Sequence, residues 1–352
     1  MKFKILVPIV LAVFLLSVAL VPALPSYAVT CQSAGSTGLT ALIVATPGET
    51  ISGETMSAAG CDVAIYVGPG ANHVSISGNY ITGANDHGIF VQDANFVTIS
   101  HNTVTGNQLS THPDCPIGGA PVLGCIAEDK AVELVGSSHS LIIGNNVSYN
   151  LGSPGGGIGI SDDGAWDPGA PFGHAGNAMP ANHNTIADNL VTFNLADCQI
   201  VVSAYNEGEG VSHNTIKGNT IDFGVTGIVV AADSPNTAAT YNSVMDNTIS
   251  NEFIPGIIIH SNTPGDVVSH NSVIGNTLSD NGADSEIPTN DGPTGIILIG
   301  AVTPVTYSVV NHNHIENEEY GIWSCNTLNS PMNGNYFSEL TVDTGIHIQE
   351  SC

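Results

Sequence analysis

The chain has 352 residues, of which 42% are hydrophobic and only 10% are charged, and its formal net charge is −27. Four lysines and no arginine oppose 31 acidic side chains, so we exclude nucleic acid and anionic membranes as partners unless cations bridge them. The 40 glycines favour short strands and tight turns over surface helices, which usually carry many charged side chains.

Residues 1–28 have the composition of a secretory signal peptide. Lys2 and Lys4 precede an apolar run that ends near Val21, and small residues close the segment at Ala28. Removal of this segment leaves two lysines against 31 acidic side chains, a net charge of −29. We therefore predict a secreted or extracytoplasmic protein with no membrane span once the signal is removed.

Seven cysteines follow the signal segment, and export makes disulfides possible. Closeness in sequence favours three pairs: Cys31 with Cys61, Cys115 with Cys125, and Cys325 with Cys352. The outer pairs would close the two ends of the fold, and the middle pair would close a loop. Cys198 is left over and opens an apolar strand, which indicates a buried thiol.

A motif repeats through the chain with a period of roughly 22–30 residues. Each copy has an apolar residue three places before an Asn and another two places after it, as in VSHNTIKGNTID from Val211 to Asp222. A short apolar strand follows each copy, often opening with Gly-Ile, as at Gly227 and Gly256. The aligned asparagines are Asn79, Asn102, Asn146, Asn189, Asn219, Asn247, Asn276, Asn313 and Asn335.

Such units cannot bury their apolar face alone and must stack into a solenoid. Three short strands per repeat predict an all-β fold, a right-handed parallel β-helix of about nine to ten coils spaced about 4.8 Å apart. Asn suits the bend because it tolerates the left-handed conformation and its amide can bond the next Asn. We expect one domain over residues 29–352, with a cap at 29–73 and a disulfide-closed end at 325–352.

These repeats resemble the right-handed parallel β-helix repeats of the pectate-lyase-like superfamily and of periplasmic NosD-type proteins. The resemblance covers nearly the whole exported chain and implies that the Gly-Ile strands form the sheet called PB1. It also implies a substrate cleft on PB1, between the T3 loops that precede its strands and the T1 loops that follow them. The implied partner is a polysaccharide or a cell-surface glycan, but fold likeness alone does not establish an activity.

Two insertions interrupt the coil. The distance from Asn102 to Ala131 is 29 residues, and the distance from Gly159 to Asn189 is 30 residues, both longer than in the other repeats. In coil order, the first is a T3 loop before one PB1 strand and the second is a T1 loop after the next strand. They are expected to wall the same patch, and long loops on a rigid scaffold usually carry function.

The strand AVEL points Glu133 into this patch, and Gly159 leaves open space beside it on the next coil. The candidate catalytic residues are Lys130, Glu133, Asp162 and Asp163. Lys130 can act as a base only if its pKa is lowered, and calcium would offset the carboxylates that raise it. Such a site resembles that of calcium-assisted lyases, which remove the proton next to a uronate carboxylate.

Two alternatives remain for this patch. Glu133 with Asp162 or Asp163 can serve as the acid and base of glycoside hydrolysis. In the other, Lys130 only pairs with Glu128 or Asp129 at the rim. The chain also lacks the arginines on which pectate lyases and polygalacturonases depend.

Other residues of the two insertions complete the predicted site. The candidate calcium ligands are Glu128, Asp129 and Asp167, because calcium prefers carboxylate oxygens. The candidate substrate contacts are Trp166, His112 and His174, of which Trp166 offers a face on which a sugar ring can stack.

Two further patterns support competing functions. His183, His213 and His270 occupy one outward column, interrupted by Tyr241, and a copper-maturation function of the NosD type would use such histidines. The outward PB1 positions also form an apolar stripe, which either the chain itself covers or a partner contacts. A non-catalytic surface or adhesion protein is therefore the main alternative to an enzyme. The stripe consists of Val201, Val229, Ile258, Ile297 and Trp323.

Overall fold

The computed structural model describes residues 30–35, 37, 39–108, 129–150, 155–162, 179–195, 198–284, 292–341, 345–350 and 352. Residues Cys31–Cys352 form one compact unit, whose described part consists of strands and turns and confirms the predicted all-β class. No helix long and apolar enough to cross a membrane occurs within these ranges. The predicted signal segment lies outside them.

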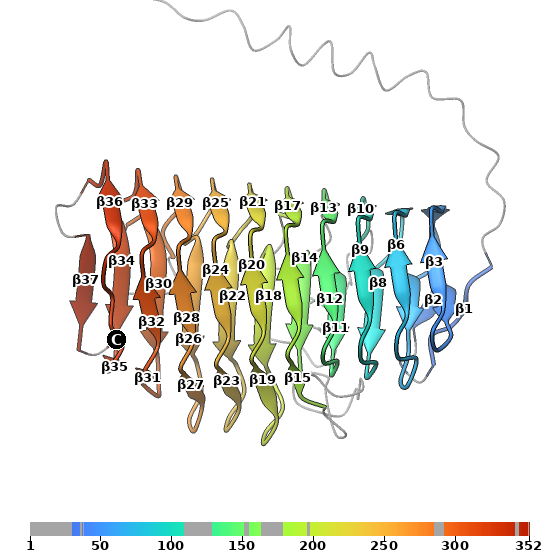
Figure 1. Ribbon diagram of the computed structural model, residues 1–352, viewed down its shortest axis with the longest axis horizontal. Coiled ribbons are helices and arrows are strands. Elements are labelled where there is room, and N and C mark those ends of the chain that lie inside the picture. The colour runs from blue at the N-terminus through green and yellow to red at the C-terminus, as the bar shows by residue number, and fades with distance from the viewer. Residues whose placement is uncertain are drawn as a thin grey trace, which may run out of the picture. The chain divides into compact units, whose positions relative to one another are not determined.

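Four sheets run along the solenoid (Figure 1). PB1 contains β1 (Gln32–Ser33), β2 (Thr40–Ala45), β5 (Val63–Val67), β8 (His87–Gln92), β11 (Asp129–Val135), β14 (Gly155–Ser161), β18 (Ile200–Ala204), β22 (Ile228–Ala232), β26 (Ile257–Ser261), β30 (Thr294–Gly300), β34 (Tyr320–Cys325) and β37 (Ile346–Gln349). All its strands pair in parallel except β1, which is antiparallel to β2 at the amino-terminal end.

PB2 and PB3 meet at the predicted Asn bend. PB2 contains β3 (Thr50–Ser52), β6 (Ser75–Ser77), β9 (Thr98–Ser100), β12 (Leu141–Ile143), β16 (Thr185–Ala187), β20 (Thr215–Lys217), β24 (Ser243–Met245), β28 (Ser272–Ile274) and β32 (Val309–Asn311). PB3 contains β4 (Thr55–Ser57), β7 (Tyr80–Thr82), β10 (Thr103–Thr105), β13 (Asn146–Ser148), β17 (Leu190–Thr192), β21 (Thr220–Asp222), β25 (Thr248–Ser250), β29 (Thr277–Ser279), β33 (His314–Glu316) and β36 (Tyr336–Ser338).

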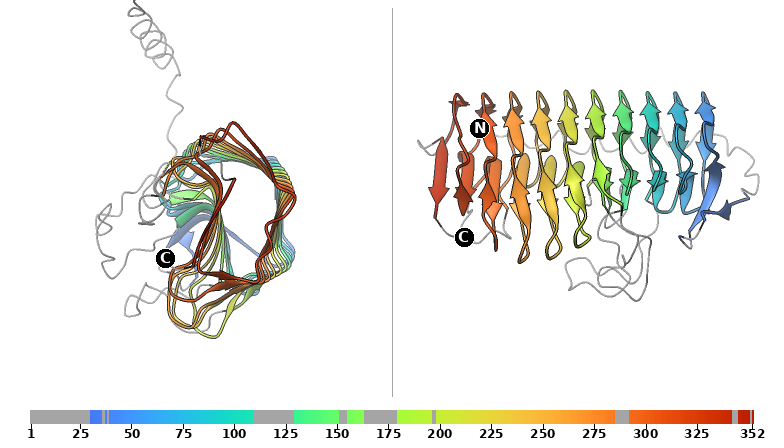
Figure 2. Two further views of the ribbon diagram at one scale, coloured as in Figure 1. Left: turned by 90° about the vertical axis from the view of Figure 1, so that its left-hand side faces the viewer. Right: turned by 60° about the horizontal axis from the view of Figure 1, so that its bottom comes forward.

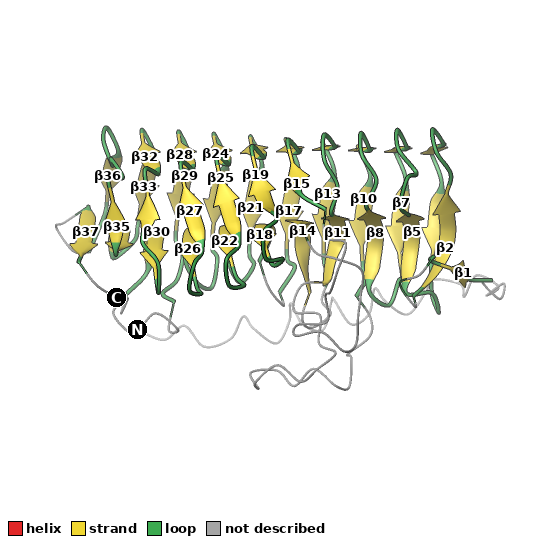
Figure 3. Ribbon diagram, turned by 90° about the horizontal axis from the view of Figure 1, so that it is seen from below, coloured by secondary structure: helices red, strands yellow, loops and turns green. Residues whose placement is uncertain are grey.

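A fourth, shorter sheet modifies the prediction of three strands per coil. It contains β15 (Ala181–Asn182), β19 (Gly210–Ser212), β23 (Ala238–Thr240), β27 (Val267–Ser269), β31 (Val305–Thr306) and β35 (Thr327–Leu328). Its strands precede those of PB2, so the later coils have four strands each. The described strands are joined mainly by short turns (Figure 3).

The core lies inside the coil, where successive turns superimpose when seen end on (Figure 2). The strands of PB2 typically point their middle residue inward and the flanking residues outward, as the period of two in an extended chain requires. The inward residues stack in columns of branched side chains, so each coil covers the apolar face of its neighbours. Ile76, Ile99, Ile142, Ile186 and Ile216 form one such column and are at most 1% exposed.

The Asn ladder is confirmed, with one member shifted. Asn145, not Asn146, accepts hydrogen bonds from Asn102, while Asn146 is the first residue of β13. The left-handed conformation expected for each ladder Asn is instead adopted by the residue before it, such as Gly218 with φ 63° and Asp246 with φ 55°. The ladder Asn therefore supplies hydrogen bonds, and its predecessor makes the turn.

Both end disulfides are confirmed. Cys31 is bonded to Cys61, and Cys325 is bonded to Cys352. Such bonds are typical of extracytoplasmic proteins. The third predicted pair, Cys115 with Cys125, lies outside the described residues. Cys198 is partly exposed rather than fully buried.

Candidate active site on sheet PB1

β8, β11 and β14 are consecutive strands of PB1, so the two insertions flank adjacent strands as predicted. Glu133 pairs in register with Phe90 of β8 and with Gly159 of β14. Val132 and Leu134 on either side of it are fully buried, so Glu133 projects from the outward face of the sheet.

His87 is a site residue that sequence reasoning missed. Its Nδ1 lies 2.9 Å from the carbonyl oxygen of Lys130 and 3.3 Å from Oε2 of Glu133. Because both oxygens are acceptors when Glu133 is ionised, Nδ1 carries the proton and donates it, which leaves Nε2 as the basic nitrogen. Phe90 stacks on the ring with a centroid distance of 4.7 Å and restrains its plane. His87 and Lys130 are 43 residues apart, but aligning β8 with β11 in register would have placed them side by side.

The space beside Glu133 is not open, which corrects the expectation for Gly159. A Cβ at Gly159 would lie 2.7 Å from Cγ of Lys130, and one at Gly156 would lie 2.9 Å from its Cδ. The aliphatic stem of Lys130 therefore crosses both glycines and fills the groove that they leave. Lys130 is fully buried and Glu133 is 4% exposed, so neither group faces bulk solvent in this structure.

The two glycines under Lys130 predict different responses to alanine. In Gly159→Ala the new methyl group meets a flexible side chain, which can shift at a cost of about 1 kcal/mol. In Gly156→Ala the new methyl group would lie 2.2 Å from the carbonyl oxygen of Cys198, a backbone atom that cannot move aside. We therefore expect the free energy of unfolding to fall by about 3 kcal/mol. Urea denaturation of both variants measures the difference, and equal losses would contradict this account of the groove.

Asp162 lies just after β14 and binds the turn that follows β18, the neighbouring strand of PB1. Its Oδ1 accepts a 2.6 Å hydrogen bond from the amide of Tyr205, and its carbonyl oxygen accepts one of 2.6 Å from Nδ2 of Asn206. Asp162 is fully buried. The contacts described for its carboxylate are thus made with the backbone of the neighbouring coil.

The other predicted site residues lie outside the described residues. These are His112, Glu128, Asp163, Trp166, Asp167 and His174, while Asp129 is described only as the first residue of β11. Within the described ranges, no group of three His, Cys, Asp or Glu side chains is arranged to hold a metal ion. The proposed calcium site and sugar contacts therefore remain predictions.

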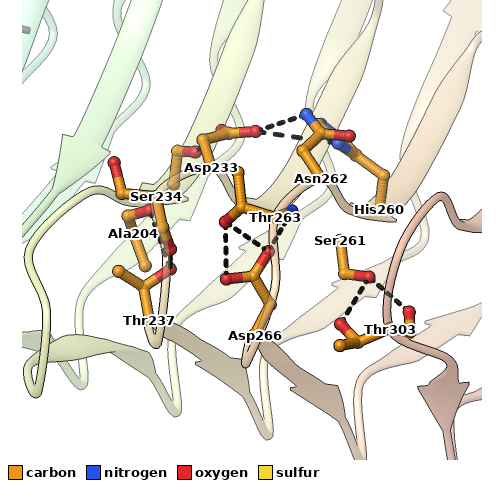
Figure 4. Close-up of polar contacts among 11 residues, drawn as sticks. Ala204, Asp233, Ser234, Thr237, His260, Ser261, Asn262, Thr263, Asp266 and Thr303 are labelled. Atoms are coloured by element: carbon orange, nitrogen blue, oxygen red, sulfur yellow. Dashed lines mark hydrogen bonds and ion pairs between the residues drawn. The ribbon is translucent and has the colours of Figure 1, made fainter.

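A second carboxylate and imidazole pair lies further along the same sheet (Figure 4). Asp233, just after β22, accepts hydrogen bonds from Oγ of Ser203 and from Nδ2 of Asn262, the latter at 2.7 Å. Nδ1 of His260, an outward residue of β26, lies 3.7 Å from Oδ1 of Asp233. Their side chains are 17% and 18% exposed, so this pair is more accessible than His87 with Glu133. The sequence signal was a histidine at an outward position of a Gly-Ile strand.

The turns around Asp233 are held by their own hydrogen bonds (Figure 4). Asp266 accepts from the amide of Thr263 at 2.6 Å and from its hydroxyl at 2.9 Å. Ser261 donates to the carbonyl oxygen of Thr303 in the next turn. These contacts restrain the backbone on which His260 and Asp233 stand.

Burial shifts two acids at the other edge of the patch. It raises the pKa of Asp93, just after β8, to about 6. Burial and, second, the charge of Asp93 raise the pKa of Tyr66 to about 12, and its hydroxyl donates a 2.8 Å hydrogen bond to Oε1 of Gln92. Asp93 is therefore a titratable group close to neutral pH beside the predicted cleft.

The apolar stripe and the histidine column both exist. Val201, Val229, Ile258, Ile297 and Trp323 pair in register on the outward face of PB1 and are at most 6% exposed. His183 stacks on His213 with centroids 4.9 Å apart, and Tyr241 lies between His213 and His270 as expected. The rings of this column lie face to face, an arrangement that does not direct their nitrogens at a common point.

Residues 40–291 match the family described as right-handed beta helix region. The chain belongs to this right-handed β-helix family. No curated protein matches the chain.

Among solved structures, this β-helix protein is similar to the family 28 exopolygalacturonase of Yersinia enterocolitica, at 13% identity and a TM-score of 0.51, over 79% of this chain and 45% of that chain. It is also similar to the exopolygalacturonase of Thermotoga maritima, at 14% identity and a TM-score of 0.50, over 80% of this chain and 53% of that one. The surface adhesin PfbA of Streptococcus pneumoniae has 13% identity and a TM-score of 0.47, over 86% and 80%. The chain spans about half the length of the two exopolygalacturonases, and such identities show the fold alone.

Proposed function

We propose that this β-helix protein is secreted and binds or modifies a polysaccharide on the outward face of PB1. The observation that carries the proposal is the oriented pair in which Nδ1 of His87 lies 3.3 Å from Oε2 of Glu133. A carboxylate that accepts from an imidazole orients the ring, and such a pair can take part in the proton transfer that glycoside hydrolysis and uronate elimination both need. His260 and Asp233 provide a similar arrangement on later rungs of the same sheet.

In this proposal the reacting groups are Lys130, Glu133 and Asp163, joined by His87, while the buried carboxylate of Asp162 holds the backbone at Tyr205. Trp166, His112 and His174 contact the sugar chain, and Glu128, Asp129 and Asp167 hold calcium. The exported chain has a net charge of −29, so a uronate polymer needs a cation at the contact, whereas a neutral polymer does not. Calcium dependence therefore separates a uronate polymer from a neutral one as the substrate, and the unsaturated end separates a lyase from a hydrolase.

The test follows two products from a panel of uronate and neutral polysaccharides, first with calcium and then with a chelator. Unsaturated ends are detected by absorbance, and reducing ends are measured separately. We expect Glu133→Gln to lower product formation by roughly 100-fold, because a group that transfers protons typically contributes that much. A lyase in which Lys130 is the base loses its unsaturated product in Lys130→Ala and in chelator.

Glu316→Gln is the matched control for Glu133→Gln. Glu316 lies 3.6 Å from an imidazole nitrogen of His314, but the pair stands on PB3 with side chains 44% and 42% exposed. The control should keep full product formation. If it loses product as Glu133→Gln does, or if no polymer yields product with the protein folded, the catalytic proposal fails and the non-catalytic adhesion function is favoured.

A further inference from the structure

A column of eight stacked rings runs along the outside of the β-helix. Each ring belongs to the residue two places before a PB2 strand, and we call this set the ring ladder. Neighbouring centroids are 4.7 to 5.2 Å apart, so the rings follow the rungs without a gap. The ring ladder consists of His73, Phe96, His139, His183, His213, Tyr241, His270 and Tyr307.

The backbone alone does not explain this choice of residues. All eight positions adopt positive φ, between 50° and 62°, and all eight are exposed. Glycine suits this conformation best, and at the neighbouring Asn bend it fills the equivalent positive-φ position in Gly78, Gly144, Gly218, Gly275 and Gly334. Of the nine residues at this position, only Gly48 before β3 is a glycine, with φ 73°, and the other eight are rings whose edges are left in water.

The surface beside the ring ladder has few charges. None of the nine PB2 strands contains Asp or Glu, although the chain has 31 acidic residues. Lys217 in β20 is exposed on this face, on the same coil as His213. The PB2 face is therefore the part of this acidic protein that repels an anion least.

Five of the eight rings are histidines, and three of them are adjacent. His139, His183 and His213 have centroid separations of 5.0 and 4.9 Å. Burial, followed by the positive charges of His213 and His139, lowers the pKa of His183. Protons added at acidic pH therefore place repelling like charges side by side, and an anion lying along the ladder would relieve that repulsion.

The charged neighbours lie at the margins of this face. Asp188 and Asp246 stand in the turns after β16 and β24, and Glu209 and Asp266 precede β19 and β27. His101 and His312 occupy the same bend as Asp188 and Asp246. These acids and histidines stand outside the ring ladder and the PB2 strands.

We propose that the ring ladder and the adjoining PB2 face form an acid-activated binding surface for a polyanionic glycan, separate from the PB1 site. The surface offers one described cation, Lys217, besides its histidines. Because histidine is the residue type that generally gains charge between pH 8 and pH 5, acid adds positive charge along a straight row of roughly 34 Å, a length set by seven steps of the rung spacing. A linear polymer with repeated anionic groups matches that row in both shape and charge.

The test uses dextran sulfate as the probe, because its sulfates stay ionised from pH 5 to 7.5, and unsulfated dextran as its neutral counterpart. We expect dextran sulfate to bind the disulfide-intact mature protein roughly tenfold or more tightly near pH 5 than near pH 7.5. We expect about 0.5 M salt to abolish this gain. Unsulfated dextran should show no gain with acid.

Two triple variants separate ring charge from ring shape. His139→Tyr, His183→Tyr and His213→Tyr together keep a stack, because tyrosine already occupies this column at φ 56° and 50°, but they remove the titration. We expect this variant to lose the gain at low pH. The control triple, His101→Asn, His312→Asn and His314→Asn, removes the same number of imidazoles outside the ring ladder and should retain it.

Three results would overturn the proposal: an unchanged gain in the tyrosine triple, an equal loss in the control triple, or a gain with unsulfated dextran. The tyrosine triple is also assayed for product from the polysaccharide panel, where its activity should equal that of the parent protein. Failure of the PB1 proposal and failure of the ring ladder are thus distinguishable.

Discussion

Replacing Asn219 by alanine is expected to lower the free energy of unfolding by about 4 kcal/mol. Asn219 is 1% exposed, and its Oδ1 accepts 3.0 Å hydrogen bonds from the backbone amide and from Nδ2 of Asn189. Its Nδ2 donates to the carbonyl oxygen of Ile186 and to Oδ1 of Asn247, at 3.1 and 2.9 Å. The substitution therefore strands a buried amide and a buried carbonyl, and each unpaired group costs about 1–3 kcal/mol.

Asn335→Ala is the matched control, since Asn335 accepts the same two bonds from Asn313, at 2.9 and 3.0 Å, but is only partly buried on the last coil. Water can reach the groups that it strands, so we expect a loss of less than about 2 kcal/mol. Urea denaturation measures both variants. A smaller loss for Asn219→Ala than for Asn335→Ala would show that the ladder does not depend on buried hydrogen bonds.

Stability should fall as pH rises from about 4.5 to about 8, because two buried glutamates keep their protons in the folded state. Burial is the main cause that raises the pKa of Glu252 and of Glu318 from 4.5 to about 8. The charge of Asp222 adds to the shift of Glu252, and the charge of Asp280 adds to that of Glu318. Within the described part of the chain, the oxygens of Glu252 make no hydrogen bond of good geometry, and the nearby backbone amide of Gly224 offsets the effect of burial only in part.

The sign follows from proton binding. Between the unfolded and the folded pKa, the folded protein holds protons that the unfolded chain has lost, so the stabilising contribution is complete below about pH 4.5 and is lost above about pH 8. A shift of this size is worth roughly 5 kcal/mol for each group. Glu318→Gln keeps the acceptor that Asn281 uses at 2.8 Å, so we expect it to fold.

We expect Glu252→Gln and Glu318→Gln each to stabilise the protein near pH 8 and to have little effect near pH 4.5. Thermal unfolding across this range measures the effect, and the double variant should show the flattest pH profile. Glu316→Gln, an exposed change on β33, is the control and should reproduce the slope of the parent protein. A parent protein whose stability rises from pH 5 to 8 would contradict the assignment.

Local pattern was enough to predict the fold and the strand register. The repeated spacing around each Asn fixes one coil per repeat, and the alternation of side chains fixes which face each residue takes. For this reason Glu133 was correctly paired with Gly159, and the apolar stripe from Val201 to Trp323 was correctly aligned. The end disulfides followed because their cysteines close short segments at the ends of the solenoid.

The candidate site was less predictable, because side-chain direction depends on neighbours far apart in sequence. His87 reaches Lys130 across 43 residues, and an insertion hides their adjacency. Lys130 could as well have extended into solvent, and only the packed sheet lays its stem over Gly156 and Gly159. Asp162 is engaged by the backbone at Tyr205 on the next coil, a contact that no local motif marks.

The sequence by itself therefore determined the coil, three of its four sheets and the register of PB1, since these follow from short-range periodicity and the burial of apolar side chains. Only the tertiary structure decided which left-handed residue precedes each ladder Asn and how Lys130 fills its groove. It also extended the predicted column of His183, His213, Tyr241 and His270 to rings from eight coils. These features arise from contacts between rungs, where separations of roughly 22–44 residues become one step of about 4.8 Å.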